Sequence, residues 1–259
     1  KEADVVILAG VPCDFRLDYG RAINHKATII SINLSRNDMY LNRRPVKGIL
    51  TSPSAFLIDW SNYEGNNTNT KWESWHGQIT KRNSARETEI IEQSKLSTEY
   101  INPIKLCVSI NEHIQDGDII VADGGDFVAT ASYILQPRSF TGWLDPGAFG
   151  TLGVGAGFIV GAKLTHPDSV VWAIYGDGAF GYSLMEFDTF VRHKIPVISI
   201  IGNDAGWTQI ARDQVDVFGD AVGTELAPTE YHKVVEALGG AGYFIDDENQ
   251  IDKILIQAK

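Results

Sequence analysis

The chain has 259 residues, a formal net charge of −11 and a hydrophobic content of 44%. This length allows one large domain or two smaller ones, with enough apolar residues for a sizeable core. The acidic balance argues against nucleic acid or an anionic membrane surface as the main partner. No signal peptide is visible, and no apolar run reaches the roughly 18 residues that a membrane span needs.

The first 45 residues have the pattern of one βαβ unit. Residues 4–9 indicate a buried strand, residues 15–23 a polar helix, and residues 28–32 a second strand. Such alternation is typical of a doubly wound α/β domain. The chain begins directly in a strand, without Met, so we expect residues 1–45 to be the carboxyl-terminal part of a domain in a longer protein.

Residues 46–95 are predicted to be a linker between that domain and a second one. Prolines interrupt the pattern over residues 45–53, and residues 54–59 are expected to form a short helix. Residues 65–70, GNNTNT, have the composition of a solvated loop. The second domain is expected to cover residues 96–259.

The second domain opens with a helix and a strand that lead into a glycine-rich turn. Residues 104–114 indicate a helix that Pro103 starts, and residues 119–122 indicate a buried strand. The strand ends on the sequence Asp-Gly-Gly-Asp at 123–126, and residues 127–134 are expected to form the next helix. Because ligands of open α/β sheets lie at the carboxyl ends of strands, this turn is a candidate wall of a cleft.

Residues 142–157 form a second glycine-rich stretch, GWLDPGAFGTLGVGAG. Taken alone, these residues fit a flexible loop followed by a helix that packs closely through small side chains. They do not fit a dinucleotide-binding fingerprint, because no predicted strand directly precedes them.

The stretch from residue 170 to residue 207 is the most informative of the chain. Two apolar strands are predicted at 170–175 and 196–201, and an amphipathic helix with apolar residues between 184 and 191 connects them. Continuous apolar strands joined by a helix indicate a parallel sheet covered on both faces. Gly176-Asp177-Gly178 follows the first strand and Asn203-Asp204 follows the second, so both acids fall at carboxyl strand ends.

This placement suits a metal-bound diphosphate. Free N–H groups of Gly178, Ala179 and Phe180 at a helix start favour an anion. Asp177 and Asp204 supply hard oxygens, and Mg²⁺ is typically held by one or two carboxylates together with substrate phosphates. A Gly-Asp-Gly tripeptide alone usually makes only a turn, so the prediction depends on both motifs together.

The remaining residues are predicted to complete the second domain. Residues 231–238 indicate a helix with one apolar face, which Gly239 and Gly240 end, and residues 243–245 indicate an edge strand.

The two acidic motifs together resemble the thiamine-diphosphate signature, in which Gly-Asp-Gly is followed at a fixed distance by an Asn-Asn pair. Here the second acid lies 27 residues after the first, at the spacing of the signature, with Asp204 in place of the second Asn. The resemblance implies that Asp177 and Asp204 are Mg²⁺ ligands and that Gly206 supplies a carbonyl ligand. Asn203 is the alternative ligand.

Further residues are assigned by the same resemblance. Gly150-Thr151-Leu152-Gly153-Val154-Gly155 is similar to a family segment in which a bulky apolar residue bends the cofactor, a role that falls on Leu152. The Gly150 carbonyl would accept from the aminopyrimidine amino group. The residues implied to contact the diphosphate are Gly125, Asp126, Phe127, Gly176, Gly178, Ala179 and Phe180.

The segments 186–197 and 202–210 resemble acetolactate-synthase-like proteins of the 2-hydroxyacyl-CoA lyase type. The resemblance implies a carbon–carbon lyase that cleaves a 2-hydroxyacyl-CoA to an aldehyde and formyl-CoA. One alternative is a carboligase of 2-keto acids. Another is a non-catalytic regulatory or binding relative.

The resemblance also sets expectations for what lies outside the chain. The glutamate that activates the cofactor is expected in an amino-terminal domain that the chain does not contain, so no glutamate here is assigned that role, and the chain alone is expected to be inactive. The full-length protein is expected to be a homodimer or homotetramer without nucleic acid partners. Its expected location is the endoplasmic reticulum membrane, with the cytoplasm as the alternative.

Overall fold

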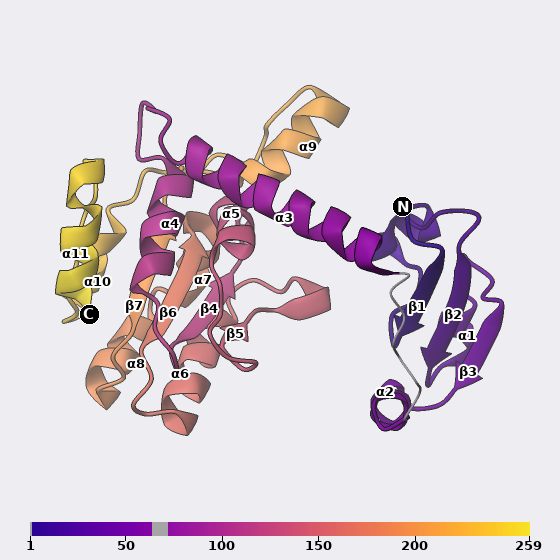
Figure 1. Cartoon of the computed structure of the whole chain (residues 1–259). Helices are drawn as coiled ribbons and strands as arrows, with labels where there is room; N and C mark the ends of the chain where they lie inside the picture. Colours follow the sequence, from indigo (N-terminus) through magenta and orange to yellow (C-terminus); the bar gives the residue numbers. More distant parts are fainter. Residues whose placement is uncertain (1, 64–71) are drawn as a thin grey trace. The chain divides into compact units, whose positions relative to one another are not determined.

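A computed structural model describes residues 2–63 and 72–259 of the chain, which divides into two compact units, Lys1–Glu73 and Ser74–Lys259. Figure 1 shows each unit as strands with helices around them. The solvated loop predicted at 65–70 lies outside the described residues.

The first unit contains a three-stranded parallel sheet in the order β1-β2-β3. The strands are β1 (Val5–Ala9), β2 (Thr28–Asn33) and β3 (Lys47–Leu50). Register pairs Ile7 with Ile30 and Ile32 with Ile49. A small core of Leu8, Cys13, Ile23 and Ile29 packs beside the strands. The predicted strands at 4–9 and 28–32 are therefore confirmed.

Two predictions in the first unit are wrong. Residues 15–23 do not form a helix; η1 (Phe15–Gly20) is a short 3-10 segment in which Asp18 and Tyr19 have φ of 49° and 52°, outside helical geometry. Residues 45–53 are predicted only to interrupt the alternation of strands and helices. In the structure they contain the strand β3, which pairs with β2. The chain divides at Glu73, so the first unit continues past residue 45 into the predicted linker.

The two helices of the first unit are short and capped by serines. In α1 (Arg36–Met39) the Ser35 hydroxyl accepts from the Asp38 N–H. In α2 (Pro53–Ser61) Ser52 is the cap and Pro53 occupies the first turn, where its missing N–H costs nothing. The short helix predicted at 54–59 is confirmed.

The second unit is organised around a four-stranded parallel sheet in the order β5-β4-β6-β7. The strands are β4 (Ile119–Asp123), β5 (Trp143–Leu144), β6 (Val171–Gly176) and β7 (Ile198–Gly202). Every residue of β4 and β6 is buried. The predicted parallel α/β fold is confirmed, because these strands lie in the middle of the sheet with helices on both faces.

The helices of the second unit are α3 (Glu73–Gln93), α4 (Pro103–His113), α5 (Asp126–Ile134), α6 (Gly155–Thr165), α7 (Asp177–Ser183), α8 (Glu186–His193), α9 (Thr208–Phe218), α10 (Tyr231–Ala237) and α11 (Ile251–Ala258). Short 3-10 segments lie at η3 (Gly147–Phe149) and η4 (Glu248–Gln250). The helix α3 begins at the boundary between the two units.

The two faces of the sheet carry separate cores. Alternate strand residues such as Ile120 and Trp172 pack against α4, α5 and α11 on one face. Their neighbours Val121 and Ala173 pack against α6, α7, α8 and α10 on the other. This alternation arises because successive side chains of a strand point to opposite faces of the sheet. The last two residues of a strand therefore face opposite sides.

Two details of the second unit differ from the sequence prediction. The segment predicted as one helix after Gly176 forms two helices, α7 and α8, that meet at Leu184 and Met185. Residues 243–245 form no strand, so β7 is an edge of the sheet.

Candidate cofactor site

The turns after β4 and β6 meet backbone to backbone at the carboxyl edge of the sheet. The Gly176 N–H donates to the Gly124 carbonyl at 2.8 Å. A Cβ on Gly125 would lie 2.9 Å from the Gly176 Cα, and Gly125 has φ of 109°. Only glycine permits both the approach and the backbone angle, which is why these turns lie side by side and start α5 and α7.

Asp177 is the buried acid of the site, with 2% of its surface exposed. Its Oδ1 accepts from the Gly178 N–H at 2.7 Å, and its Oδ2 accepts from the Gly206 N–H at 3.1 Å. Burial raises the pKa of Asp177, and the charge of Asp204 raises it further, while the N–H donors oppose both effects. A buried carboxylate that faces a second acid is stabilised by a cation between them.

The turn after β7 holds Asp204 and Gly206 in a fixed backbone. The Trp207 N–H donates to the Thr224 carbonyl at 2.7 Å, and the Leu226 N–H donates to the Ala205 carbonyl at 2.8 Å. Ala205 has φ of 56°, a left-handed conformation that this pairing supports. The side-chain amide of Asn203 donates to the Thr229 carbonyl at 2.9 Å, and both Asn203 and Asp204 are exposed residues. Of these two residues, Asp204 therefore has the less constrained side chain.

Aromatic rings pack directly on two glycines of the site. A Cβ on Gly178 would lie between 2.5 and 2.8 Å from ring carbons of Trp207. A Cβ on Gly202 would lie 2.5 Å from Cβ and Cγ of Phe127. The Trp207 contact links the start of α7 to the turn after β7, and the Phe127 contact links α5 to the end of β7.

The glycine-rich stretch forms a loop that reaches back to the end of β4. Both carboxylate oxygens of Asp123 accept from the Gly153 N–H, at 3.1 and 3.0 Å, and Oδ2 also accepts from the Gly155 N–H at 2.8 Å. Burial raises the pKa of Asp123, and these donors act against that rise. Leu152 is half-buried, and its Cδ2 would lie 2.0 Å from a Cβ on Gly124. Leu152, the residue expected to bend the cofactor, therefore lies against the turn after β4.

A groove of about 1500 Å³ lies along the edge strand β7, with residues 239–246 and α11 also in its lining, and it reaches the carboxyl-edge turns at Asp177 and Asp204. The predicted site residues that line it are Asp126, Phe127, Gly176, Asp177, Asp204 and Gly206. Those that lie outside its lining are Gly125, Gly150, Leu152, Gly178, Ala179 and Phe180. The structure thus brings the three predicted metal ligands and some of the residues predicted to contact the diphosphate, Asp126, Phe127 and Gly176, to a single groove.

Two predicted diphosphate residues have side chains engaged elsewhere. Phe180 is fully buried, and its ring packs edge-on against Tyr175, Phe187 and Tyr231. Asp126 pairs with Arg212 of α9. The whole of Phe180 has 0% exposure and lies outside the groove lining, so neither its ring nor its backbone is open to a ligand in this structure. The charge of Asp126 is offset by the Arg212 cation.

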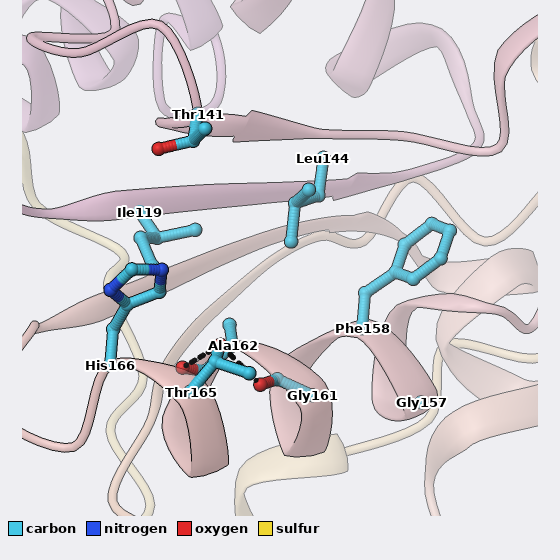
Figure 2. A pocket seen from close by; sticks show the side chains of 9 residues that line it. All are labelled: Ile119, Thr141, Leu144, Gly157, Phe158, Gly161, Ala162, Thr165 and His166. Carbon is cyan, nitrogen blue, oxygen red and sulfur yellow. Dashed lines mark hydrogen bonds between the residues drawn. The ribbon is translucent and has the colours of Figure 1, made fainter.

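A smaller cavity of about 310 Å³ lies between α6 and the β4–β5 side of the sheet. Figure 2 shows Leu144 and Phe158 beside it, with Ile119 and His166 on one side. Since Ile119 is the first residue of β4 and Asp123 the last, this cavity is separate from the site at the carboxyl edge.

The donor set at the carboxyl edge fits a magnesium diphosphate. Among residues 2–63 and 72–259 no group of three His, Cys, Asp or Glu side chains forms a complete metal cluster. Two carboxylates and a carbonyl are nonetheless what Mg²⁺ takes from protein when phosphates supply further ligands.

In the same described ranges no helix is long and apolar enough to cross a membrane.

Residues 123–259 match the family described as thiamine pyrophosphate enzyme, C-terminal TPP binding domain. The chain belongs to the thiamine pyrophosphate enzyme family. The resemblance seen in the two acidic motifs is therefore confirmed, and the match begins at Asp123 and includes every residue assigned to the site.

Named relatives extend the similarity over almost the whole chain. The chain is 47% identical to 2-hydroxyacyl-CoA lyase 2 of Mus musculus over 98% of its length, and 46% identical to that of Homo sapiens over 100%. It is 33% identical over 94% to a probable acetolactate synthase of Mycobacterium bovis. The chain spans 41% to 44% of the length of these relatives.

A solved structure confirms the fold. The thiamine diphosphate-dependent 4-hydroxybenzoylformate decarboxylase of Rhodococcus jostii RHA1 matches 98% of the chain with a TM-score of 0.73 and 16% identity, over 46% of its own length. At this identity the match concerns fold alone.

The sequence prediction missed two residues that shape the site. The sequence prediction places Asp123 only in a turn, although an acid that ends an otherwise apolar strand is, like the acid that follows β6 at Asp177, a polar residue at a carboxyl strand end. Arg212 gave no signal, because its partner Asp126 lies 86 residues earlier in the chain. The ligand roles assigned to individual residues stay predictions.

Proposed function

We propose that the full-length protein is a thiamine-diphosphate-dependent lyase that cleaves 2-hydroxyacyl-CoA to an aldehyde and formyl-CoA. The observation that carries this proposal is 47% identity over 98% of the chain to 2-hydroxyacyl-CoA lyase 2 of Mus musculus. Identity to the acetolactate synthase is 33%. Residues shared by both kinds of enzyme would raise both identities alike. The higher identity to the lyase therefore reflects similarity outside those shared residues.

The chain's own residues would hold the cofactor at the carboxyl edge of the sheet. Asp177 and Asp204, with the Gly206 carbonyl, are proposed to bind Mg²⁺, and the turns at Gly125 and Gly176 to face the diphosphate. When bound, thiamine diphosphate supplies the electron sink that carbon–carbon cleavage needs. The protein supplies position and charge, because Asp177 follows the buried strand β6 and Asp204 follows the neighbouring edge strand β7.

The second wall of the site is the loop that begins at Gly150. We propose that Leu152 supports the cofactor from below and that the Gly150 carbonyl orients its aminopyrimidine ring. The activating glutamate is assigned to a part of the full-length protein outside this chain. The catalytic residue itself therefore stays unknown.

An acetolactate-synthase-like carboligase is the second candidate, favoured by the 33% identity over 94% of the chain. A non-catalytic relative is the third. The pair Asp177 and Asp204 argues against a relative that has lost cofactor binding, because a buried acid beside a second acid is costly without a cation.

The test is a product assay on the full-length protein with thiamine diphosphate and Mg²⁺. We expect equimolar aldehyde and formyl-CoA from a 2-hydroxyacyl-CoA and little acetolactate from pyruvate. Acetolactate as the main product would favour the carboligase. No turnover of either substrate by a protein that binds the cofactor would favour a non-catalytic role.

Assembly and location are proposed on the same basis. A homodimer or homotetramer is expected, because the cofactor must meet residues from another domain, and small molecules are expected as substrates. The endoplasmic reticulum membrane is the proposed location, with the cytoplasm as the alternative.

A further inference from the structure

Asp123 is a fully buried carboxylate whose only role in the sequence pattern is to end a strand. It has 0% exposure and lies beside Tyr175 on the neighbouring strand, in register with it. Its oxygens accept from the N–H groups of Gly153 and Gly155 at distances from 2.8 to 3.1 Å. A buried carboxylate is costly unless such donors satisfy it, so this acid and the glycine loop depend on one another.

Asp123 acts as the cap of α6 from a distant strand. The helix begins at Gly155, and the residue at its own cap position, Val154, has no side chain that can accept a hydrogen bond. The Asp123 carboxylate accepts the first N–H of the helix, where the helix dipole also favours negative charge.

Neighbouring atoms leave no room for a side chain at Gly153 or at Gly155. A Cβ on Gly155 would lie 2.7 Å from the Tyr175 hydroxyl and 2.9 Å from Asp123 Oδ2. A Cβ on Gly153 would lie 2.8 Å from the Cβ of Tyr182, and Gly153 has φ of 84°. The loop therefore runs between β4 on one side and α7 on the other.

The residue just before these two glycines is Leu152, which the family resemblance assigns to bend the cofactor. Leu152 precedes Gly153, whose N–H is bound to Asp123, and its side chain lies against Gly124, the residue that follows Asp123. Asp123 thus adjoins the turn at Gly124 that the Leu152 side chain contacts, and it also binds the loop that contains Leu152.

We propose that Asp123 is a positioning residue for the cofactor, because it holds the loop at Gly150–Gly155 so that Leu152 and the Gly150 carbonyl face the bound ring. This inference rests on the proposed function only in naming thiamine diphosphate as the ligand. Asp123 does not touch the reacting atoms and acts through the loop.

Two substitutions at this position separate shape from hydrogen bonding. Asp123→Ala removes every acceptor for the Gly153 and Gly155 N–H groups. Asp123→Asn retains the shape and one oxygen, and an oxygen in the Oδ2 position accepts from both glycines, as Oδ2 does now. A positioning role predicts that Asn rescues most of what Ala loses.

Asp118→Ala is the matched control. Asp118 is also buried, and its Oδ2 also accepts two N–H groups, from Gln115 and from the Trp172 indole. It immediately precedes β4, whereas Asp123 is the last residue of that strand. Its loss should destabilise the domain without reaching the glycine loop.

The experiment measures amide hydrogen exchange over residues 150–156 and calorimetric affinity for thiamine diphosphate with Mg²⁺, in the full-length protein. Loss of charge-assisted bonds predicts that Asp123→Ala accelerates loop exchange and raises the cofactor Kd, each by about tenfold or more. Asp123→Asn should stay within about threefold of the parent in Kd, on the scale of one weakened hydrogen bond. Asp118→Ala should leave both measurements unchanged.

Parental loop exchange and affinity in Asp123→Ala would overturn the proposal, and so would equal acceleration by Asp118→Ala. If Asp123→Ala does not fold, Asp123→Asn decides: a slight acceleration of a few fold confined to residues 150–156 supports the role, and parental exchange or uniform acceleration overturns it. Neither measurement requires turnover. A protein that binds the cofactor but cleaves no 2-hydroxyacyl-CoA would therefore contradict the proposed function and leave the test of Asp123 intact.

Discussion

Gly178→Ala tests the packing that joins the two acidic turns, with a control in the same helix. The added Cβ would lie 2.5 to 2.8 Å from ring carbons of Trp207, whereas carbons in contact prefer about 3.5–4.0 Å. The ring or the helix must move by about 1 Å, and such overpacking costs about 1–3 kcal/mol. Gly181 lies three residues on in α7, and a Cβ there would meet nothing within 4 Å.

The two substitutions add the same atom and should have opposite effects. Gly181→Ala should stabilise the chain by about 0.5–1 kcal/mol, because alanine is the better helix residue. Gly178→Ala should lower the free energy of unfolding and also weaken Mg²⁺-dependent cofactor binding, because Trp207 follows the predicted ligand Gly206. Urea denaturation and calorimetric titration measure the two effects. Equal stability of the two variants would refute the packing argument.

Two further predictions concern the glycine loop. Leu152→Ala should reduce kcat of the full-length enzyme far more than it reduces the free energy of unfolding. The stability loss should stay below the roughly 2–5 kcal/mol of a fully buried leucine, because Leu152 is half-buried. Proportionate losses in turnover assays and urea denaturation would make Leu152 an ordinary packing residue. Burial raises the pKa of Asp123, so the protonated acid stabilises the fold below the unfolded pKa of about 3.9, and this contribution is lost as pH rises through the folded value. The stability of the parent relative to Asp123→Asn should therefore fall as pH rises from about 4, and a difference independent of pH in urea denaturation would contradict this.

The sheet of the second unit could be predicted because its middle strands are buried on both faces. Such strands appear as continuous apolar runs, and the residues that end them are conspicuous when they are acidic. The short β3 was missed because Lys47 and Gly48 give it no apolar pattern, and its pairing with β2 depends on a distant partner. Residues 243–245 have the composition of a strand but no partner in the sheet, and composition alone does not supply one.

The position of Asp177 and Asp204 in the fold could be predicted, because each follows a strand that is visible in the sequence, and their role as ligands stays a prediction. The site could not be predicted where a contact joins residues far apart in sequence. The bonds of Asp123 to Gly153 and Gly155 span about thirty residues, and the packing of Trp207 on Gly178 spans as many. The glycines were visible in the sequence, but their necessity follows from the side chains that approach them.

The central claim is that Asp177 and Asp204 form one cation site for a diphosphate. Two such charges about 4 Å apart repel by roughly 4 kcal/mol at an effective dielectric of 20, so the cofactor should require Mg²⁺. The most direct measurement titrates Mg²⁺ against thiamine diphosphate binding in the full-length parent, Asp204→Asn and Asp204→Ala. Asn retains a coordinating oxygen and should bind at a higher Mg²⁺ concentration, whereas Ala should not bind where the parent saturates. Binding by Asp204→Ala at the parent's Mg²⁺ concentration would show that Asp204 is not a ligand.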